Sequence, residues 1–170
     1  MMLLLCKAGQ SFAQYDSIVK VNRVKYQQIR NDKESFETTK VNLTGETDRN
    51  TQATAYYKGD DLKIIEVMRY DASGHKQIEY YFESGMLFFA LERNQPPDEV
   101  VVVSKEKNNK KTGMDANPAP TENRYYFYED KLIRWLDNVK KDVDINSPAN
   151  AAAGESLVSE AYKMKEKLKK

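Results

Sequence analysis

The sequence has little of what most enzyme sites are built from. Among its 170 residues there is one cysteine, Cys6, and one histidine, His75. A zinc site of the usual cysteine and histidine type is therefore excluded, as is a disulfide within the chain. Catalysis that needs a buried histidine has only His75 to draw on, and this residue follows a predicted turn at Ser73–Gly74. We expect no enzyme activity, no metal and no cofactor.

The chain also lacks a strong net charge and a long apolar run. Lysine and arginine number 27 against 26 aspartate and glutamate residues, for a formal net charge of +1. No global field therefore favours nucleic acid as a partner. No later segment approaches the roughly 20 apolar residues of a membrane-spanning helix, so we predict no transmembrane segment.

A short acidic segment resembles the opening of a calcium-binding loop. It reads Asp142-Val143-Asp144-Ile145-Asn146, but the expected glycine at the sixth position is Ser147 and the glutamate at the twelfth is Ala153. These departures remove the sharp turn and the bidentate ligand. We interpret the segment as a loop between sheet and helix.

Residues 1–13 bear on the cellular location of the protein. Met1–Cys6 is apolar, and Ser11 and Ala13 occupy the −3 and −1 positions of a small-x-small cleavage site. The basic region and longer apolar stretch of a typical signal peptide are missing. We expect a signal-peptide remnant and export to the periplasm or cell surface, the alternative being an ordinary disordered N-terminus. Leu5 before Cys6 disfavours a lipid anchor, because such anchors need a small residue there.

Apolar residues at helical spacing predict a helix near each end of the chain. The first is expected over residues 17–31, with an apolar face made of Ile18, Val21, Val24, Tyr26 and Ile29. The second is expected to begin at Pro148, with Gly154 as a candidate interruption and an apolar face made of Leu157, Ala161, Met164 and Leu168.

The middle of the chain has strand patterns separated by turn residues. The predicted strands are 39–43, 54–57, 62–70, 77–83, 86–91, 99–103, 124–129 and 132–136, and residues 105–123 are a predicted mobile loop. We therefore predict one α+β domain, an antiparallel β-meander of about six to eight strands with an N-terminal and a C-terminal helix packed on or beside the sheet, both on one face. The main body spans residues 14–146, and residues 147–170 form the C-terminal amphipathic helix of the same domain.

Three segments share a tyrosine-pair unit, at residues 55–62, 79–87 and 124–132. Seven of the eleven tyrosines lie in them. When the units are aligned on the second tyrosine (Tyr57, Tyr81 and Tyr126), the first is one residue shorter than the others. Adjacent residues of a strand point to opposite faces of a sheet. Each pair is therefore expected to place one ring in the core and the other on the outer face.

Two of these segments carry a resemblance to a known group of proteins. The segment Tyr-Tyr-Phe-Glu-Ser-Gly-Met-Leu at 80–87 and residues 124–136 resemble small uncharacterised secreted or periplasmic proteins of Gram-negative bacteria that have a Tyr-Tyr-Phe-x-x-Gly-x-Leu pattern. They are also distantly similar to hairpin repeats of the MORN type. The resemblance covers about residues 41–138 and implies a β-meander but no activity, because that group has no assigned function. Asp130 stands where the pattern has glycine.

Aromatic side chains on the outer face of the sheet are the candidate binding surface: Tyr57, Tyr81, Tyr126, Tyr128 and Trp135. Such side chains are favoured anchors at interfaces. The alternative is that a helix covers this face and makes the tyrosines core residues. We predict a non-catalytic module that binds a protein or a glycan. A structural envelope component that self-associates weakly through a sheet edge is the second hypothesis, and a small-ligand carrier or enzyme is the least favoured.

Overall fold

The computed structural model describes residues 12–43, 50–71, 74–96 and 119–169. All seven of its strands form one antiparallel sheet whose spatial order is the order of the sequence. This is the predicted α+β meander. Its elements are α1 (Phe12–Asp32), a 3-10 turn η1 (Lys33–Ser35), β1 (Glu37–Leu43), β2 (Thr51–Lys58), β3 (Asp61–Asp71), β4 (Gly74–Glu83), β5 (Met86–Gln95), β6 (Thr121–Tyr128), β7 (Lys131–Leu136) and α2 (Pro148–Lys167).

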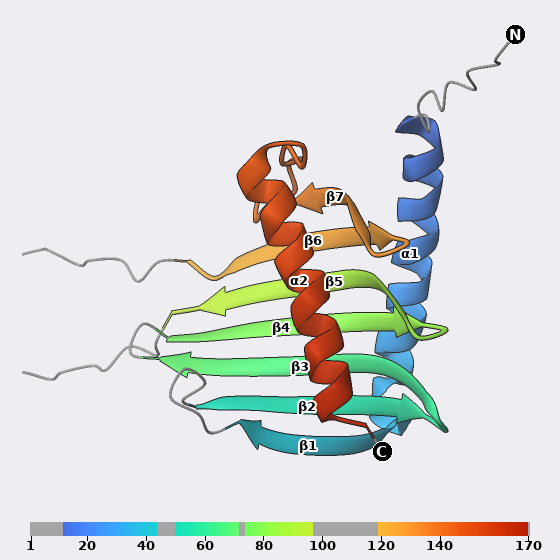
Figure 1. The fold of residues 1–170 in the computed structure, drawn as a ribbon, viewed down its shortest axis with the longest axis vertical. Coiled ribbons are helices and arrows are strands. Elements are labelled where there is room, and N and C mark those ends of the chain that lie inside the picture. The colour runs from blue at the N-terminus through green and yellow to red at the C-terminus, as the bar shows by residue number, and fades with distance from the viewer. Residues whose placement is uncertain (1–11, 44–49, 72–73, 97–118, 170) are drawn as a thin grey trace, which may run out of the picture.

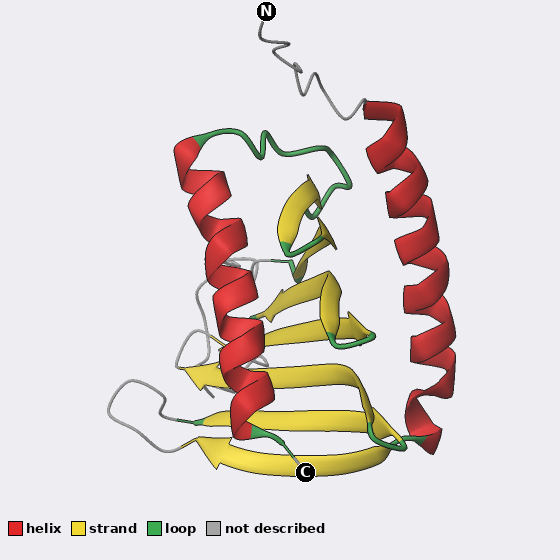
Figure 2. Cartoon of the chain, turned by 45° about the vertical axis from the view of Figure 1, so that its right-hand side comes forward, coloured by secondary structure: helices red, strands yellow, loops and turns green. Residues whose placement is uncertain are grey.

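The two helices cover opposite faces of the sheet, with the strands between them (Figures 1 and 2). The expectation that both lie on one face was wrong. Tyr80 packs in the core under α2 and Tyr81 in the core under α1, and neither is exposed to solvent. Because the central strands carry large apolar side chains on both faces, each face needs a helix to exclude water.

The three tyrosine-pair hairpins have the same register and the same defect. Each has a two-residue turn, and in each the pairing shifts by one residue shortly after the turn. The shift leaves one extra residue on the returning strand, which is a β-bulge. The extra residues are Lys63, Phe88 and Ile133.

This register shows which tyrosines are equivalent. Tyr56, Tyr81 and Tyr126 each lie one position before the shift, and all three face α1. The equivalent of Tyr57 is therefore a phenylalanine in the other two hairpins, Phe82 and then Phe127. With this alignment the three units have equal length, so the apparently shorter first unit was an error of one residue in the sequence alignment.

The turns explain how the third hairpin forms without the glycine of the pattern. Ser84 and Gly85 both have positive φ angles, 50° and 78°, as in the type I′ turns favoured in hairpins. Glu129 and Asp130 adopt the same conformation at 48° and 58°. Asp130 also accepts a 2.7 Å hydrogen bond from the hydroxyl of Tyr162 on α2.

Helix α1 begins five residues before its predicted start, and its buried stripe matches the prediction in part. Tyr26 and Ile29 are buried as expected. Val21 and Val24 are 52% and 57% exposed, contrary to expectation, whereas Val19 is buried together with Asn22. The buried Asn22 donates from Nδ2 to the carbonyl oxygens of Phe88 and Phe127, both at 3.1 Å. It thus joins α1 to the second and third hairpins.

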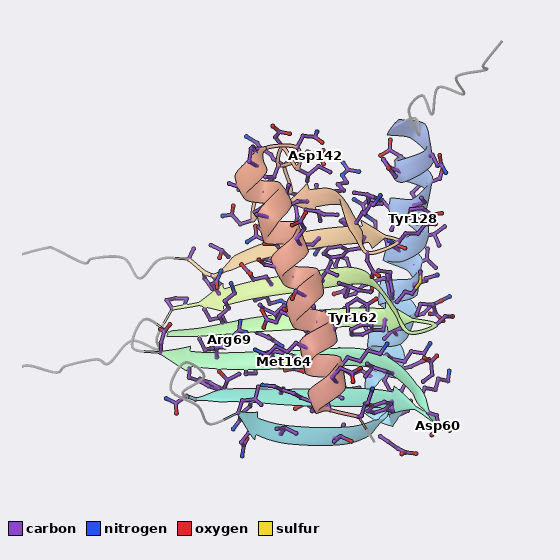
Figure 3. The ribbon with its side chains drawn as sticks, viewed as in Figure 1. Asp60, Arg69, Tyr128, Asp142, Tyr162 and Met164 are labelled. Carbon is purple, nitrogen blue, oxygen red and sulfur yellow. The ribbon has the colours of Figure 1, made fainter. Side chains whose placement is uncertain are left out.

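Helix α2 is capped by Ser147, whose Oγ accepts from the backbone N–H of Asn150 at 3.4 Å. Its predicted apolar face is buried, and Figure 3 shows Met164 and Tyr162 on α2 over the middle of the sheet. Gly154 does not interrupt the helix. A Cβ atom at this position would lie 2.9 Å from Cβ of Leu132, so glycine allows the helix to approach β7 closely.

Two predicted elements, the strand at 99–103 and most of the loop at 105–123, lie outside the described residues. The loop prediction was wrong at its end, because β6 already begins at Thr121. Within the part of the chain that is described, no helix is both long and apolar enough to cross a membrane.

The contact made by Asn22 gives a test of how α1 is held. Asn22→Ala leaves two backbone carbonyl groups without their buried donor, so we expect the free energy of unfolding to fall by about 1–3 kcal/mol. Val21→Ala, at the exposed neighbouring position, should change it by less than about 0.5 kcal/mol. Denaturant unfolding of both variants would check this, and equal losses would show that Asn22 contributes only helix packing.

Candidate functional site

Helix α1 covers only part of its face of the sheet. It runs across the strands near the β2–β3, β4–β5 and β6–β7 turns (Figure 1) and packs there on Ile64, Tyr81, Phe89 and Tyr126. Farther from these turns the same face carries polar side chains that are mostly half-buried. We refer to this region as the charged face, which consists of Arg30, Lys33, Glu66, Gln77, Glu79, Arg93, Glu122, Arg124 and Lys140.

Two carboxylates lie opposite each other at the centre of the charged face. Glu66 on β3 pairs with Glu79 on β4, and like charges in directly opposed positions destabilise a sheet. Gln77 relieves this repulsion by donating from Nε2 to Oε1 of Glu66 at 3.0 Å and to Oε1 of Glu79 at 3.1 Å. Nζ of Lys33 lies 2.7 Å from Oε2 of Glu66 and 3.9 Å from Oε1 of Glu79. The lysine thereby ties η1 to two strands.

Glu79 is the most deeply buried charge of this group, with 5% of its side chain exposed. Its Oε2 accepts a 2.7 Å hydrogen bond from the hydroxyl of Tyr81. Nη1 of Arg93 lies 3.4 Å from its Oε1 and Nη1 of Arg30 lies 3.7 Å from its Oε2. Burial of the Tyr81 hydroxyl, together with the negative charge of Glu79, raises the pKa of Tyr81 far above its usual range. Tyr81 therefore remains a neutral donor to Glu79.

Glu122 on β6 collects the remaining cations. Nζ of Lys140 and Nη2 of Arg124 lie 2.7 Å and 2.8 Å from its Oε1, and Nε of Arg93 lies 3.2 Å from its Oε2. Burial alone would raise the pKa of this carboxyl, but hydrogen bonds from Lys140 and Arg124 lower its pKa to about 2. Glu122 is therefore ionised throughout the physiological range.

The charged face has more positive than negative groups. Five cations (Arg30, Lys33, Arg93, Arg124 and Lys140) surround three carboxylates (Glu66, Glu79 and Glu122). Such a surplus attracts acidic groups.

Burial would lower the pKa of Lys33, but its bond to Glu66 raises that pKa overall. Lys33 is thus not a base near neutral pH, as a general acid–base role would need.

The aromatic residues singled out in the sequence do not form one exposed surface. Tyr57, Tyr81 and Tyr126 are 6%, 0% and 1% exposed. The first lies under α2 and the other two under α1. Tyr128 is half-buried on the α1 side, and Trp135 is half-buried on the α2 side with its ring 4.9 Å from that of Tyr125. The alternative interpretation, in which helices cover the tyrosines, is the one that applies, because each pair divides its rings between two covered faces.

His75 and Asp142, which were weighed as site residues from the sequence, each contact a neighbouring side chain. The half-buried His75 lies beside Tyr70, with 5.7 Å between the ring centroids. Asp142 accepts hydrogen bonds from Nε and Nη2 of Arg134 at 2.6 Å and 2.9 Å. Among the described residues there is no group of three or more histidine, cysteine, aspartate or glutamate side chains that could hold a metal ion.

The charged face was not predicted from the sequence. A signal was present, because Glu66 and Glu79 each interrupt an apolar strand and a carboxylate in such a strand needs a partner. The partner Lys33 could not be inferred, since it lies in a different element far along the chain.

Comparison with known proteins gives no information on the function of the charged face. No protein-family model matches the chain, and no curated protein or solved structure is significantly similar to it. The resemblance to the Tyr-Tyr-Phe-x-x-Gly-x-Leu group therefore stays a prediction.

The low pKa of Glu122 predicts how stability depends on pH. Because its pKa of about 2 lies below the ordinary value of about 4.3, the ionised carboxylate stabilises the fold above pH 4–5, and this contribution is lost as the pH falls toward 2. Glu122→Gln should lower the free energy of unfolding at pH 7 by on the order of 1–3 kcal/mol. The difference from the wild type should shrink toward pH 2.

Denaturant unfolding at several pH values would measure this. Glu155→Gln, at an exposed position on α2, is the matched control and should follow the wild type at every pH. A difference between Glu122→Gln and the wild type that stayed constant from pH 7 to pH 2 would contradict the assignment.

Proposed function

We propose that this chain is a non-catalytic binding module and that the charged face binds an acidic surface on a protein partner. The observation that carries the proposal is the surplus of cations on a half of the sheet that α1 leaves uncovered. On the α2 side the ion pairs are balanced, with Arg69 matched to Glu160 and Lys76 to Glu92. Among the described ion pairs, the group of five cations around three carboxylates is confined to the charged face.

The side chains that the charged face presents favour a protein over a glycan as the partner. The tyrosines that would have formed an aromatic platform are buried. The charged face instead presents Arg93 and Arg124, half-buried and held by Glu122. On the same side of the sheet, the ring of Tyr70 on β3 is 43% exposed. Arginine and tyrosine are the residues most often found as interface anchors. Arginines already held in place lose little entropy on binding.

The compartment that we propose, the periplasm or the cell surface, rests on residues 1–13. The expected cleavage point between Ala13 and Gln14 falls just inside α1. Cleavage there would remove two residues of the helix and leave Val19 and the rest of its buried stripe in place. Export and the fold are therefore compatible.

Added negative charge tests the binding surface without disturbing its ion pairs. Gln52→Glu together with Gln95→Glu places two carboxylates at exposed positions on the α1 side of β2 and β5. We expect this variant to lose proteins that the wild type captures from extracts of its native host, because acidic partners are repelled. Capture would be quantified by mass spectrometry.

The matched control carries the same two chemical changes elsewhere. Gln14→Glu with Gln27→Glu lies at exposed positions of α1 and should capture the same proteins as the wild type. The proposal fails if both double variants lose the partner equally or if Gln52→Glu with Gln95→Glu retains it.

A second candidate function, self-association into an envelope structure, is favoured by the outer edge of β1. Among the described strands, β1 ends the sheet and pairs only with β2. At the opposite edge β7 is partly covered, because Leu136 bridges to Asp142 and the N–H of Val143 donates to the carbonyl oxygen of Trp135. A free edge can add a strand from another chain.

Self-association would appear as mass that rises with concentration. If β1 pairs with a second copy, light scattering should show dimers at high protein concentration. Thr39→Lys should remove them, because it puts a second lysine beside Lys40 on the edge strand. A constant monomer mass for the wild type at all concentrations would exclude this candidate.

A further inference from the structure

A cavity of about 470 Å³ lies beside the C-terminal turns of α1, at the hairpin-turn end of the sheet. Its walls come from α1 and from the first two tyrosine-pair hairpins. Asp60, labelled in Figure 3, marks the turn of the first of these hairpins. The volume is within the range of small-molecule sites. It is lined by Gln28, Ile29, Asn31, Asp32, Phe36, Lys58, Lys63 and Glu83.

Lys63 is the unusual residue of this cavity. It is the bulge residue of the first hairpin, where the second and third hairpins have Phe88 and Ile133. All three side chains are buried, and Lys63 is only 9% exposed. This position of the repeat therefore fits an apolar side chain. A buried lysine there departs from the usual preference for apolar core residues, and such departures are typical of functional sites.

The surroundings of Lys63 keep it charged. Its Nζ lies 2.7 Å from Oδ2 of Asp61 and 3.2 Å from Oε1 of Glu83. Burial alone would lower the pKa of Lys63, but the hydrogen bonds to these carboxylates raise it overall. The side chain therefore presents a fixed ammonium group at the wall of the cavity.

The rest of the cavity lining has both charged and apolar side chains. Lys58 and Asp32 lie across the mouth, with Nζ and Oδ2 3.9 Å apart and both side chains more than half exposed. Ile29 and Phe36 are buried and form the apolar part of the lining. A purely anionic ligand would be repelled by Asp32 and Glu83, and a purely cationic one by the two lysines.

We propose that this cavity binds a small zwitterion, of the size of a free amino acid or a dipeptide. The ligand carboxylate contacts Lys58 and Lys63, and its ammonium group contacts Asp32 and Glu83. Its side chain lies on Ile29 and Phe36. The site is separate from the charged face, because Gln28 and Asp32 lie on one flank of α1 and Arg30 on the other. It does not depend on the proposed protein partner.

Lys63→Met separates ligand binding from stability. Methionine restores the apolar character of the other two hairpins, and the carboxylates that lose their partner remain solvated, since Asp61 and Glu83 have 43% and 35% of their side chains exposed. We expect the variant to melt at or above the temperature of the wild type. It should bind the ligand at least tenfold more weakly.

Amide chemical shifts of the ¹⁵N-labelled full chain would measure binding of the dipeptide alanylalanine. Saturable shifts are expected at Asn31, Lys63 and Glu83, and they should be weaker for acetate or methylamine alone, each of which has only one of the two charges. Lys40→Met, at an exposed position of β1, should bind as the wild type does. If Lys63→Met does not fold, Lys58→Met at the exposed mouth replaces it and should also weaken binding.

Several results would overturn the proposal. One is the absence of saturable shifts with alanylalanine up to about 50 mM, where even weak specific binding is measurable. Another is equal affinity for acetate and the dipeptide, which would show a simple anion site. A third is unchanged affinity in the folded Lys63→Met variant, or in Lys58→Met if it is the one used.

Discussion

The architecture depends on the burial of large side chains on both faces of the central strands. Tyr80 and Tyr81 follow each other in β4, so their rings enter different layers, and both are completely buried. A single antiparallel sheet usually leaves one face in contact with water. Here that arrangement would expose several aromatic rings, each representing 150–250 Å² of surface. One helix on each face is the simplest solution, and the described residues include two long helices that can provide it.

The β-bulges determine how the α1 face differs from the α2 face. Each bulge makes two consecutive residues of the returning strand point toward α1, as Phe88 and Phe89 do. The two side chains enlarge the apolar surface under α1 near the turns, and the helix packs on that surface. The carbonyl groups of Phe88 and Phe127 are then satisfied by Asn22. Because α1 is held near the turns, the half of the sheet farther from them is left for polar side chains.

The fold could be predicted from the sequence, but its layering could not. Alternation of apolar residues and the turn residues Gly59 and Gly85 indicate hairpins, and hairpins joined in order indicate a meander. The bulges were missed because Lys63 and Phe88 have nothing in common as side chains. Without the bulges, the tyrosines were aligned one residue out of register. Helical periodicity identified α1 but selected Val21 and Val24 for its buried face, because a buried asparagine such as Asn22 gives no hydrophobic signal.

The candidate sites were harder to predict because they depend on charges brought together from distant elements. A buried ion pair stabilises a fold weakly, and apolar residues of the same volume often serve better. Lys33 and Lys63 are both ion-paired near the C-terminal part of α1. The second and third hairpins show with Phe88 and Ile133 that an apolar side chain fits the position of Lys63. Stability alone therefore does not explain the charge at Lys63, and the ligand site that we propose gives it a role.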